Sequence, residues 1–181
     1  MASQELATLG GGCFWCIEAA FNMLKGVTQV ESGYAGGQLP NPDYQAICRG
    51  DSGHAEVIRV QFDPERIDYK QLLEVFFQLH DPTQLNRQGN DVGTQYRSVI
   101  FYHNEEQRNI AQTIMKEIDQ AEIWPAPLVT ELSPCPEFYP AEGYHQNYVT
   151  QNPNQPYCAL IVNPKLSKFK HQFADLLEPE K

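Results

Sequence analysis

The fold is decided first by residues 4–21, QELATLGGGCFWCIEAAF. Gln4–Leu9 is short and largely apolar and is bounded by glycine, a pattern typical of a β-strand. Three glycines follow, and the residues from Cys13 to Phe21 then have the composition of a helix. We therefore predict a strand that turns directly into a helix, with Cys13 at the N-terminus of that helix.

Other short segments of β-branched or apolar residues predict further strands, because Gly, Pro, Asn or Asp bounds each of them. These predicted strands are Val27–Tyr34, Ala55–Phe62, Ser98–His103, Val129–Leu132 and Cys158–Val162.

Three further helices have recognisable start signals. Asp68 with Gln71 three residues later forms a capping-box pattern, and Asn104 begins a second segment of the same kind. Asn163 is followed by a proline, which is favoured at the first helical position. The isoleucines of the second segment recur every four residues, so this helix should bury one apolar stripe.

The resulting order over the first hundred residues is strand, helix, strand, strand, helix, strand. It predicts an α+β fold, a two-layer α/β sandwich with a mixed sheet and a ferredoxin-like β-α-β-β-α-β core. With 181 residues, no internal repeat and no linker, residues 1–181 should form a single catalytic domain. Gly33–His54 and Asp81–Tyr96 lack any period, and ordered loops of this length are usually functional.

Composition and charge exclude several function classes. The formal net charge of −10 disfavours binding to nucleic acid or to an anionic membrane surface. No apolar run approaches the roughly 18 residues that a bilayer span requires. The first basic residue is Lys25, so we expect no secretory signal and a cytoplasmic location. Five cysteines without an export signal indicate thiols that stay reduced unless chemistry oxidises them.

Cys13 has the setting of a nucleophile. Unpaired backbone N–H groups and the helix dipole would stabilise a thiolate there, and the glycines beside it would let a substrate approach the backbone. The alternative is an inert buried thiol. With Cys16 it forms C-x-x-C, which alone fits a thioredoxin-like redox pair, half of a zinc site or coincidence. We expect no metal, because no second C-x-x-C or H-x-x-x-H accompanies the pair.

Several motifs in order resemble the peptide methionine sulfoxide reductase A family over nearly the whole chain. They are GCFWCIEAAF, GYAGG, PNPDY, GDSGHAE, FFQLHDPTQ, RQGNDVGTQYRS, GYHQNY and NPNQPYC. The resemblance implies reduction of methionine sulfoxide, free or in oxidised proteins, with selectivity for the S epimer at sulfur. It also implies that thioredoxin regenerates the enzyme through a disulfide and that no organic cofactor is bound.

The resemblance also implies residue roles, which fit the chemistry of a poorly electrophilic sulfoxide. Cys13 matches the nucleophile. Glu56 matches the acid, whose pKa must be raised so that a proton is available near neutral pH. Tyr44 and Tyr96 match tyrosines whose hydroxyls point at the sulfoxide oxygen, and Asp91 matches a carboxylate that supports this polar network.

Four aromatic or histidine positions also match the family. Phe14 and Trp15 correspond to the apolar pocket for the S-methyl group of the substrate. His145 and Tyr148 align as well, and the sequence leaves open whether they touch substrate or only brace Glu56.

The resolving thiol departs from the common family pattern. Many members have glycine where this chain has Cys16, and carry resolving cysteines in a glycine-rich C-terminal tail. Here Cys16 is the first choice, because it lies three residues after Cys13 on the same helical face. Cys158, which matches the first tail cysteine of longer members, is the second choice.

Two other functions remain open from the residues. A thioredoxin-type thiol–disulfide oxidoreductase would also use C-x-x-C after a strand, although the acid Glu56 is superfluous to that chemistry. A non-enzymatic module that binds sulfur-containing or aromatic peptides is the third possibility, and the intact catalytic positions argue against it.

Overall fold

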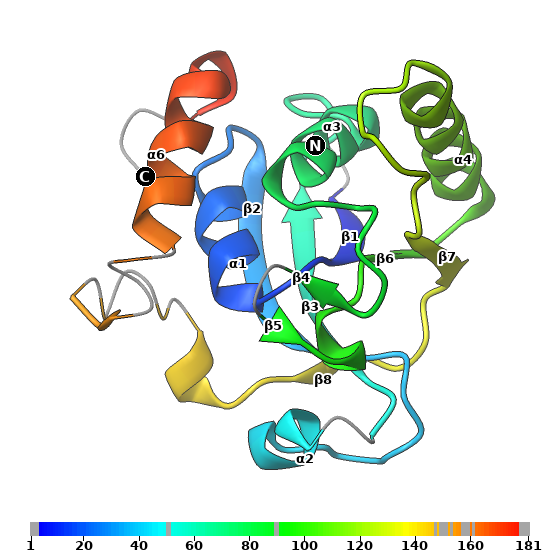
Figure 1. Ribbon diagram of the computed structural model, residues 1–181. Helices are drawn as coiled ribbons and strands as arrows, with labels where there is room; N and C mark the ends of the chain where they lie inside the picture. Colours follow the sequence, from blue (N-terminus) through cyan, green and yellow to red (C-terminus); the bar gives the residue numbers. More distant parts are fainter. Residues whose placement is uncertain are drawn as a thin grey trace.

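The computed structural model describes residues 4–49, 52–88, 91–146, 148, 152, 154–156, 160 and 162–177. One sheet of six strands forms the centre, in the order β7-β6-β1-β3-β2-β8 (Figure 1). The sheet strands are β1 (Glu5–Gly10), β2 (Val27–Ala35), β3 (Ala55–Phe62), β6 (Val99–Tyr102), β7 (Glu131–Pro134) and β8 (Tyr139–Pro140). A separate small ladder pairs β4 (Arg87–Gln88) with β5 (Asp91–Val92).

Helices connect most of the strands. The α-helices are α1 (Phe14–Asn22), α2 (Tyr44–Cys48), α3 (Tyr69–Leu79), α4 (Glu105–Gln120) and α6 (Asn163–Gln172). The short 3-10 helices are η1 (Thr94–Tyr96), η2 (Gly143–His145) and η4 (Ala174–Leu176). No helix within the described residues is both long and apolar enough to cross a bilayer.

The sheet is mixed, as predicted. β1 pairs antiparallel with β3 and β6, and β2 pairs antiparallel with β3 and β8, whereas β6 and β7 are parallel. The α+β class with helices packed on a mixed sheet is therefore confirmed. β3 has the predicted bounds, and β7 begins two residues later than the predicted strand Val129–Leu132.

The last predicted strand, Cys158–Val162, is wrong where it can be compared. Cys158 lies outside the described residues. Val162 has helical dihedral angles, φ −74° and ψ −49°, and caps the N-terminus of α6. Its side chain is fully buried in the core. Val162 therefore packs in the core at the start of α6 and does not pair in the sheet, whereas Leu160, the other described residue of this run, is exposed.

The main core lies between the sheet and the helices. α1 and α3 lie over the strands, α6 lies beside α1, and α4 lies beside α3 (Figure 1). Ile58 and Val60 of β3 belong to this core, whereas Val57 belongs to a smaller cluster on the opposite face, which Cys135 and Phe138 cover. Because side chains alternate along a strand, Glu56 lies on the buried face that α1 covers.

The predicted starts of α3 and α4 are confirmed, whereas α6 begins one residue earlier than predicted, with Val162 and not Asn163 as its N-cap. The carboxylate of Asp68 accepts the backbone N–H of Gln71, and the Gln71 side chain accepts the N–H of Asp68. Asn104 accepts the N–H of Gln107, but the Gln107 side chain accepts the N–H of His103, one residue before the cap. Such caps contribute about 1 kcal/mol each, so α3 and α4 begin where their sequences specify.

Candidate active site

The glycine turn from β1 to α1 packs tightly against two side chains, His80 and Gln88. Gly12 has φ +84°, which favours glycine, and a Cβ there would lie 2.9 Å from Gln88 Cγ. A Cβ on Gly11 would lie 2.8 Å from the ring of His80. The missing Cβ atoms of these glycines therefore permit the close packing of His80 and Gln88. Both glycines also line a small cavity beside Cys13, so their role in giving a substrate access to the backbone stays a prediction.

The His80 ring packs against this turn at Gly11. Its ring nitrogens lie 2.7 Å from the Phe76 carbonyl oxygen and 2.7 Å from the Ser98 hydroxyl. Burial lowers the pKa of His80 to about 4, so the ring is neutral near pH 7. It is a structural link between α3 and the strand side of the site.

Cys13 lies directly before α1, as predicted, with extended backbone angles of φ −67° and ψ 128°. Burial raises the pKa of its thiol well above the ordinary value, and the charges of Glu56, Cys16 and Asp91 raise it further. A hydrogen bond from the Trp15 backbone N–H lowers it, but does not compensate. Desolvation and the nearby carboxylates thus act against the thiolate that the helix N-terminus favours, and the thiolate expected from the sequence stays a prediction.

Glu56 has the protonation state that the proposed acid requires. Its side chain is 1% exposed, and its Oε1 accepts the backbone N–H of Phe14 at 3.2 Å. Burial raises its pKa to about 8, the Phe14 hydrogen bond lowers it, and the charge of Asp91 raises it. Most of Glu56 is therefore a neutral carboxylic acid at pH 7.

Two tyrosines lie within electrostatic range of this acid. Tyr44 begins α2 and interacts with Glu56 and Tyr96, whereas Tyr96 ends η1 and interacts with Glu56, Cys13 and Asp91. Burial raises the pKa of both hydroxyls, so they stay protonated hydrogen-bond donors. The structure thus gathers all five polar positions suggested by the sequence, although they come from separate loops and strands.

The aromatic residues divide into a buried and a partly exposed set. Trp15 is partly exposed and stacks on Tyr148, with ring centroids 3.8 Å apart and planes 7° apart. Its Nε1 donates to His145 Nδ1 at 3.1 Å. Phe14 is fully buried between Tyr34 and His145. Trp15 and Tyr148 thus offer an accessible aromatic wall, whereas Phe14 supports it from within the core.

Glu142 is a site residue that sequence reasoning missed. Its Oε1 accepts the Tyr34 hydroxyl at 3.0 Å, and its Oε2 accepts the Tyr44 backbone N–H at 2.9 Å. Partial burial acts to raise its pKa, but these hydrogen bonds and the charge of His145 lower the pKa overall. An ionised Glu142 therefore holds the first residue of α2 in place. The acid directly before GYHQNY was the available signal.

Cys48 was missed as well, because the short helix α2 has too few residues to show a period. The thiol hydrogen-bonds the Tyr44 side chain one helical turn earlier and also interacts with Tyr96. Had a helix been predicted at PNPDY, the four-residue spacing would have indicated this contact.

Cys16 lies next to the proposed nucleophile. Its backbone N–H donates to the Cys13 carbonyl at 3.2 Å, and both residues line one small cavity. Cys13, Cys16, Cys48 and Cys135 are free thiols, and Cys158 lies outside the described residues. Within the described part of the chain, no three His, Cys, Asp or Glu side chains are placed to hold a metal ion.

A thiol at a helix N-terminus beside a protonated acid, on an α+β scaffold, is an arrangement that suits a thiol-dependent oxidoreductase. The family model described as peptide methionine sulfoxide reductase matches residues 5–177. Peptide methionine sulfoxide reductase MsrA of Chromobacterium violaceum is 56% identical over 175 residues, which cover 97% of this chain and 99% of that relative. The chain therefore belongs to the peptide methionine sulfoxide reductase family, as its motifs indicated.

Solved structures agree with this assignment. Reduced Mxr1 from Saccharomyces cerevisiae matches with a TM-score of 0.77 and 36% identity, over 84% of this chain and 87% of that chain. Mxr1 in complex with Trx2 matches with a TM-score of 0.55 and 26% identity, over 80% of this chain and 84% of that chain.

Proposed function

We propose that this protein reduces the S epimer of methionine sulfoxide, free or in oxidised proteins, with Cys13 as nucleophile and Glu56 as acid. The observation that carries the proposal is the neutral carboxyl of Glu56, held by the Phe14 N–H and in electrostatic contact with Cys13. A sulfoxide is a poor electrophile until its oxygen is protonated, and this acid supplies that proton. Family membership supports the same reaction.

In the first step the Cys13 sulfur attacks the sulfoxide sulfur while Glu56 protonates the oxygen. Because the pKa of Cys13 is raised, its proton leaves only as the new S–S interaction forms, and the Glu56 carboxylate accepts it. Tyr44 and Tyr96 donate hydrogen bonds to the oxygen, and Asp91 supports their network. The hydroxyl group then passes from the methionine sulfur to the Cys13 sulfur as the S–O bond and the new S–S bond break, so that methionine leaves as the thioether and Cys13 becomes a sulfenic acid. Trp15, with Phe14 behind it, packs against the S-methyl group.

In the second step Cys16 condenses with the Cys13 sulfenic acid, which forms a disulfide and releases water. The short separation along α1 and the shared cavity support Cys16 as first choice. Cys158 remains the second choice.

A thioredoxin then reduces the disulfide. The yeast relative Mxr1 has been solved in complex with Trx2, which supports this choice of reductant class. Four free thiols and a need for a reducing thiol pool support the cytoplasm as the location, which cell fractionation would test.

The strand order β6-β1-β3-β2 with all neighbours antiparallel supports a ferredoxin-like β-α-β-β-α-β core. The family match over residues 5–177 supports one catalytic domain.

One assay tests the proposed function against its alternatives. The protein is incubated with racemic methionine sulfoxide and dithiothreitol, and methionine and both sulfoxide epimers are quantified. We expect half of the sulfoxide to be consumed and the R epimer to remain. A protein that makes no methionine but reduces insulin disulfides would be a thioredoxin-type oxidoreductase. A protein that binds peptides without turnover would be a binding module.

A further inference from the structure

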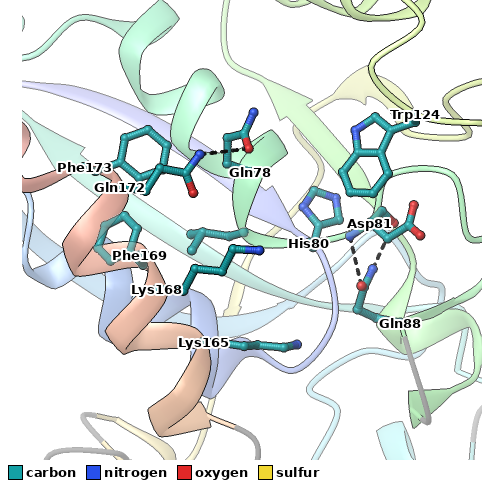
Figure 2. A pocket seen from close by; sticks show the side chains of 11 residues that line it. Gln78, His80, Asp81, Gln88, Trp124, Lys165, Lys168, Phe169, Gln172 and Phe173 are labelled. Carbon is teal, nitrogen blue, oxygen red and sulfur yellow. Dashed lines mark hydrogen bonds between the residues drawn. The ribbon is translucent and has the colours of Figure 1, made fainter.

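A groove of about 210 Å³ lies between the C-terminal end of α3 and α6. Figure 2 shows Lys165 and Lys168 reaching from α6 toward the side that carries His80 and Gln88, with Trp124 at the edge. The far wall is rigid, because Gln88 exchanges two hydrogen bonds with the backbone of Asp81, at 2.9 and 3.0 Å. These hydrogen bonds hold one wall of the groove in a fixed position.

This groove leads to the reactive thiols. Leu79, Gln88 and Lys165 line both the groove and the small cavity that contains Cys13 and Cys16. That cavity has a volume of about 20 Å³, room for about one water molecule. A methionine sulfoxide side chain is too large for it, whereas a single cysteine sulfur needs far less space.

The substrate cluster lies apart from the groove. Glu56, Tyr44, Tyr96 and Trp15 line neither the groove nor the small cavity. Asp91 of the polar network does line the small cavity, so Cys13 and Asp91 lie where the acid and aromatic cluster meets the cavity that contains Cys16. A sulfoxide that contacts the acid and the tyrosines would leave the groove free.

The groove also has an unusual charge for this protein. The chain has a formal net charge of −10, yet Lys165 and Lys168 stand next to each other on one face of α6. Within the described residues neither lysine has an ion-pair partner. Asp81 also lines the groove, so the two lysines leave it with a net positive charge, and the partly exposed Trp124 adds an aromatic edge. This composition is typical of a protein-binding site.

We propose that this groove is the docking surface for the reductant, a protein dithiol that carries acidic side chains around its reactive cysteines. The inference rests on the proposed function, because it requires the Cys13–Cys16 disulfide. The acidic rim of the reductant contacts Lys165 and Lys168, its apolar surface packs on Trp124, and its reactive sulfur enters the small cavity.

The two thiols of the reductant are sufficient to reduce the Cys13–Cys16 disulfide. A thiolate of the reductant attacks the Cys16 sulfur, the Cys13–Cys16 bond breaks, and the Cys13 sulfur leaves with the electron pair and accepts a proton from Glu56. The second thiol of the reductant attacks the mixed disulfide, and Cys16 is released. The reductant loses two electrons and ends as a disulfide, and its two thiol protons restore Glu56 and Cys16.

The test compares two reductants in the same enzyme. The variants are Lys168→Glu and Trp124→Ala, neither of which lines the thiol cavity. Lys170→Glu is the matched control, because it has the same charge change on the same helix outside the groove. Turnover of saturating methionine sulfoxide is measured with purified bacterial thioredoxin at varied concentration, and separately with dithiothreitol. Circular dichroism melts check that each variant is folded.

We expect Lys168→Glu to raise the KM for thioredoxin about tenfold at low salt, and high salt to reduce this difference. Trp124→Ala should raise the same KM with no salt dependence of its effect. Lys170→Glu and every dithiothreitol-driven rate should match the wild type.

Two results would overturn the docking proposal. One is an unchanged KM for thioredoxin in both groove variants. The other is a raised KM for an oxidised peptide under dithiothreitol, which would assign the groove to the substrate. Failure of the proposed function would appear differently, as a wild-type protein that forms no methionine with dithiothreitol.

Discussion

Glu56→Gln is the sharpest test of the acid. Glutamine keeps the volume of the side chain and an oxygen that accepts the Phe14 N–H, so the fold of the turn is preserved. It removes the proton that the sulfoxide oxygen must receive. Loss of a positioned acid lowers the rate of the chemical step about 10²- to 10⁴-fold. We expect that loss in the single-turnover rate of Cys13 oxidation.

The pH dependence gives a second and independent readout. The pKa of Glu56 is about 8, so about nine-tenths of it is protonated at pH 7 and about one-tenth at pH 9. The wild-type single-turnover rate should therefore fall about tenfold between these pH values. The pKa of the Cys13 thiol is raised, so this decrease of the rate with pH reports the ionisation of Glu56. In Glu56→Gln the decrease should disappear.

The same substitution should stabilise the protein. The pKa of Glu56 is raised from 4.5 to about 8, so the unfolded chain releases this proton first. The free energy of unfolding therefore falls as the pH rises from about 4.5 to about 8, by an amount on the order of 3 kcal/mol at pH 7. Glu56→Gln abolishes that loss and should be more stable than the wild type at pH 7.

Rapid-quench measurement of methionine release and urea unfolding at pH 5, 7 and 9 provide both readouts. Glu74→Gln, at an exposed position on α3, is the matched control and should change neither. A Glu56→Gln rate close to that of the wild type would mean that the tyrosines supply the proton. A rate that still falls between pH 7 and pH 9 in Glu56→Gln would assign the titration to another group.

Three further predictions concern the rest of the site. Cys13→Ser should abolish methionine formation with an unchanged circular dichroism spectrum, and residual activity above a few percent would remove Cys13 from its role. Cys16→Ser, treated with one equivalent of sulfoxide, should accumulate Cys13 sulfenic acid and lose thioredoxin-dependent turnover, and a Cys13–Cys158 disulfide in the wild type would reverse the ranking of the two thiols. Glu142→Ala should lower kcat about tenfold, because its hydrogen bonds to the Tyr34 hydroxyl and the Tyr44 backbone N–H are both lost, while the Cys13 thiol still reacts with iodoacetamide at the wild-type rate.

Elements defined by local chemistry could be predicted from the sequence. β3 has its predicted bounds, because Ala55 follows a turn and Phe62 precedes an aspartate and a proline. α3 begins at its capping box for the same local reason. Val162 was assigned wrongly, because it is buried in the core as the N-cap residue of α6, and its burial depends on packing against residues that are distant in sequence.

The site likewise combines features that local sequence predicts with contacts that arise only in the folded chain. Cys13, Glu56, Tyr44, Tyr96 and Asp91 were identified through motifs that resemble the family, but no local pattern shows that Glu142 contacts Tyr44 across the fold. The pKa of Cys13 was also beyond sequence reasoning. A helix N-terminus is a local feature and favours a thiolate, whereas desolvation and the approach of Glu56 and Asp91 arise only in the folded chain.

The raised pKa values of Cys13 and Glu56 have a joint consequence for selectivity. A thiolate reacts with peroxides and disulfides, whereas the protonated thiol of the resting enzyme reacts poorly with both. Glu56 and Cys13 together hold two protons near neutral pH. In the proposed mechanism, Glu56 donates a proton to the sulfoxide oxygen as the sulfur is attacked and then accepts the proton of the Cys13 thiol. We therefore expect the resting thiol to react more slowly with hydrogen peroxide than with methionine sulfoxide, because only the sulfoxide uses both protons.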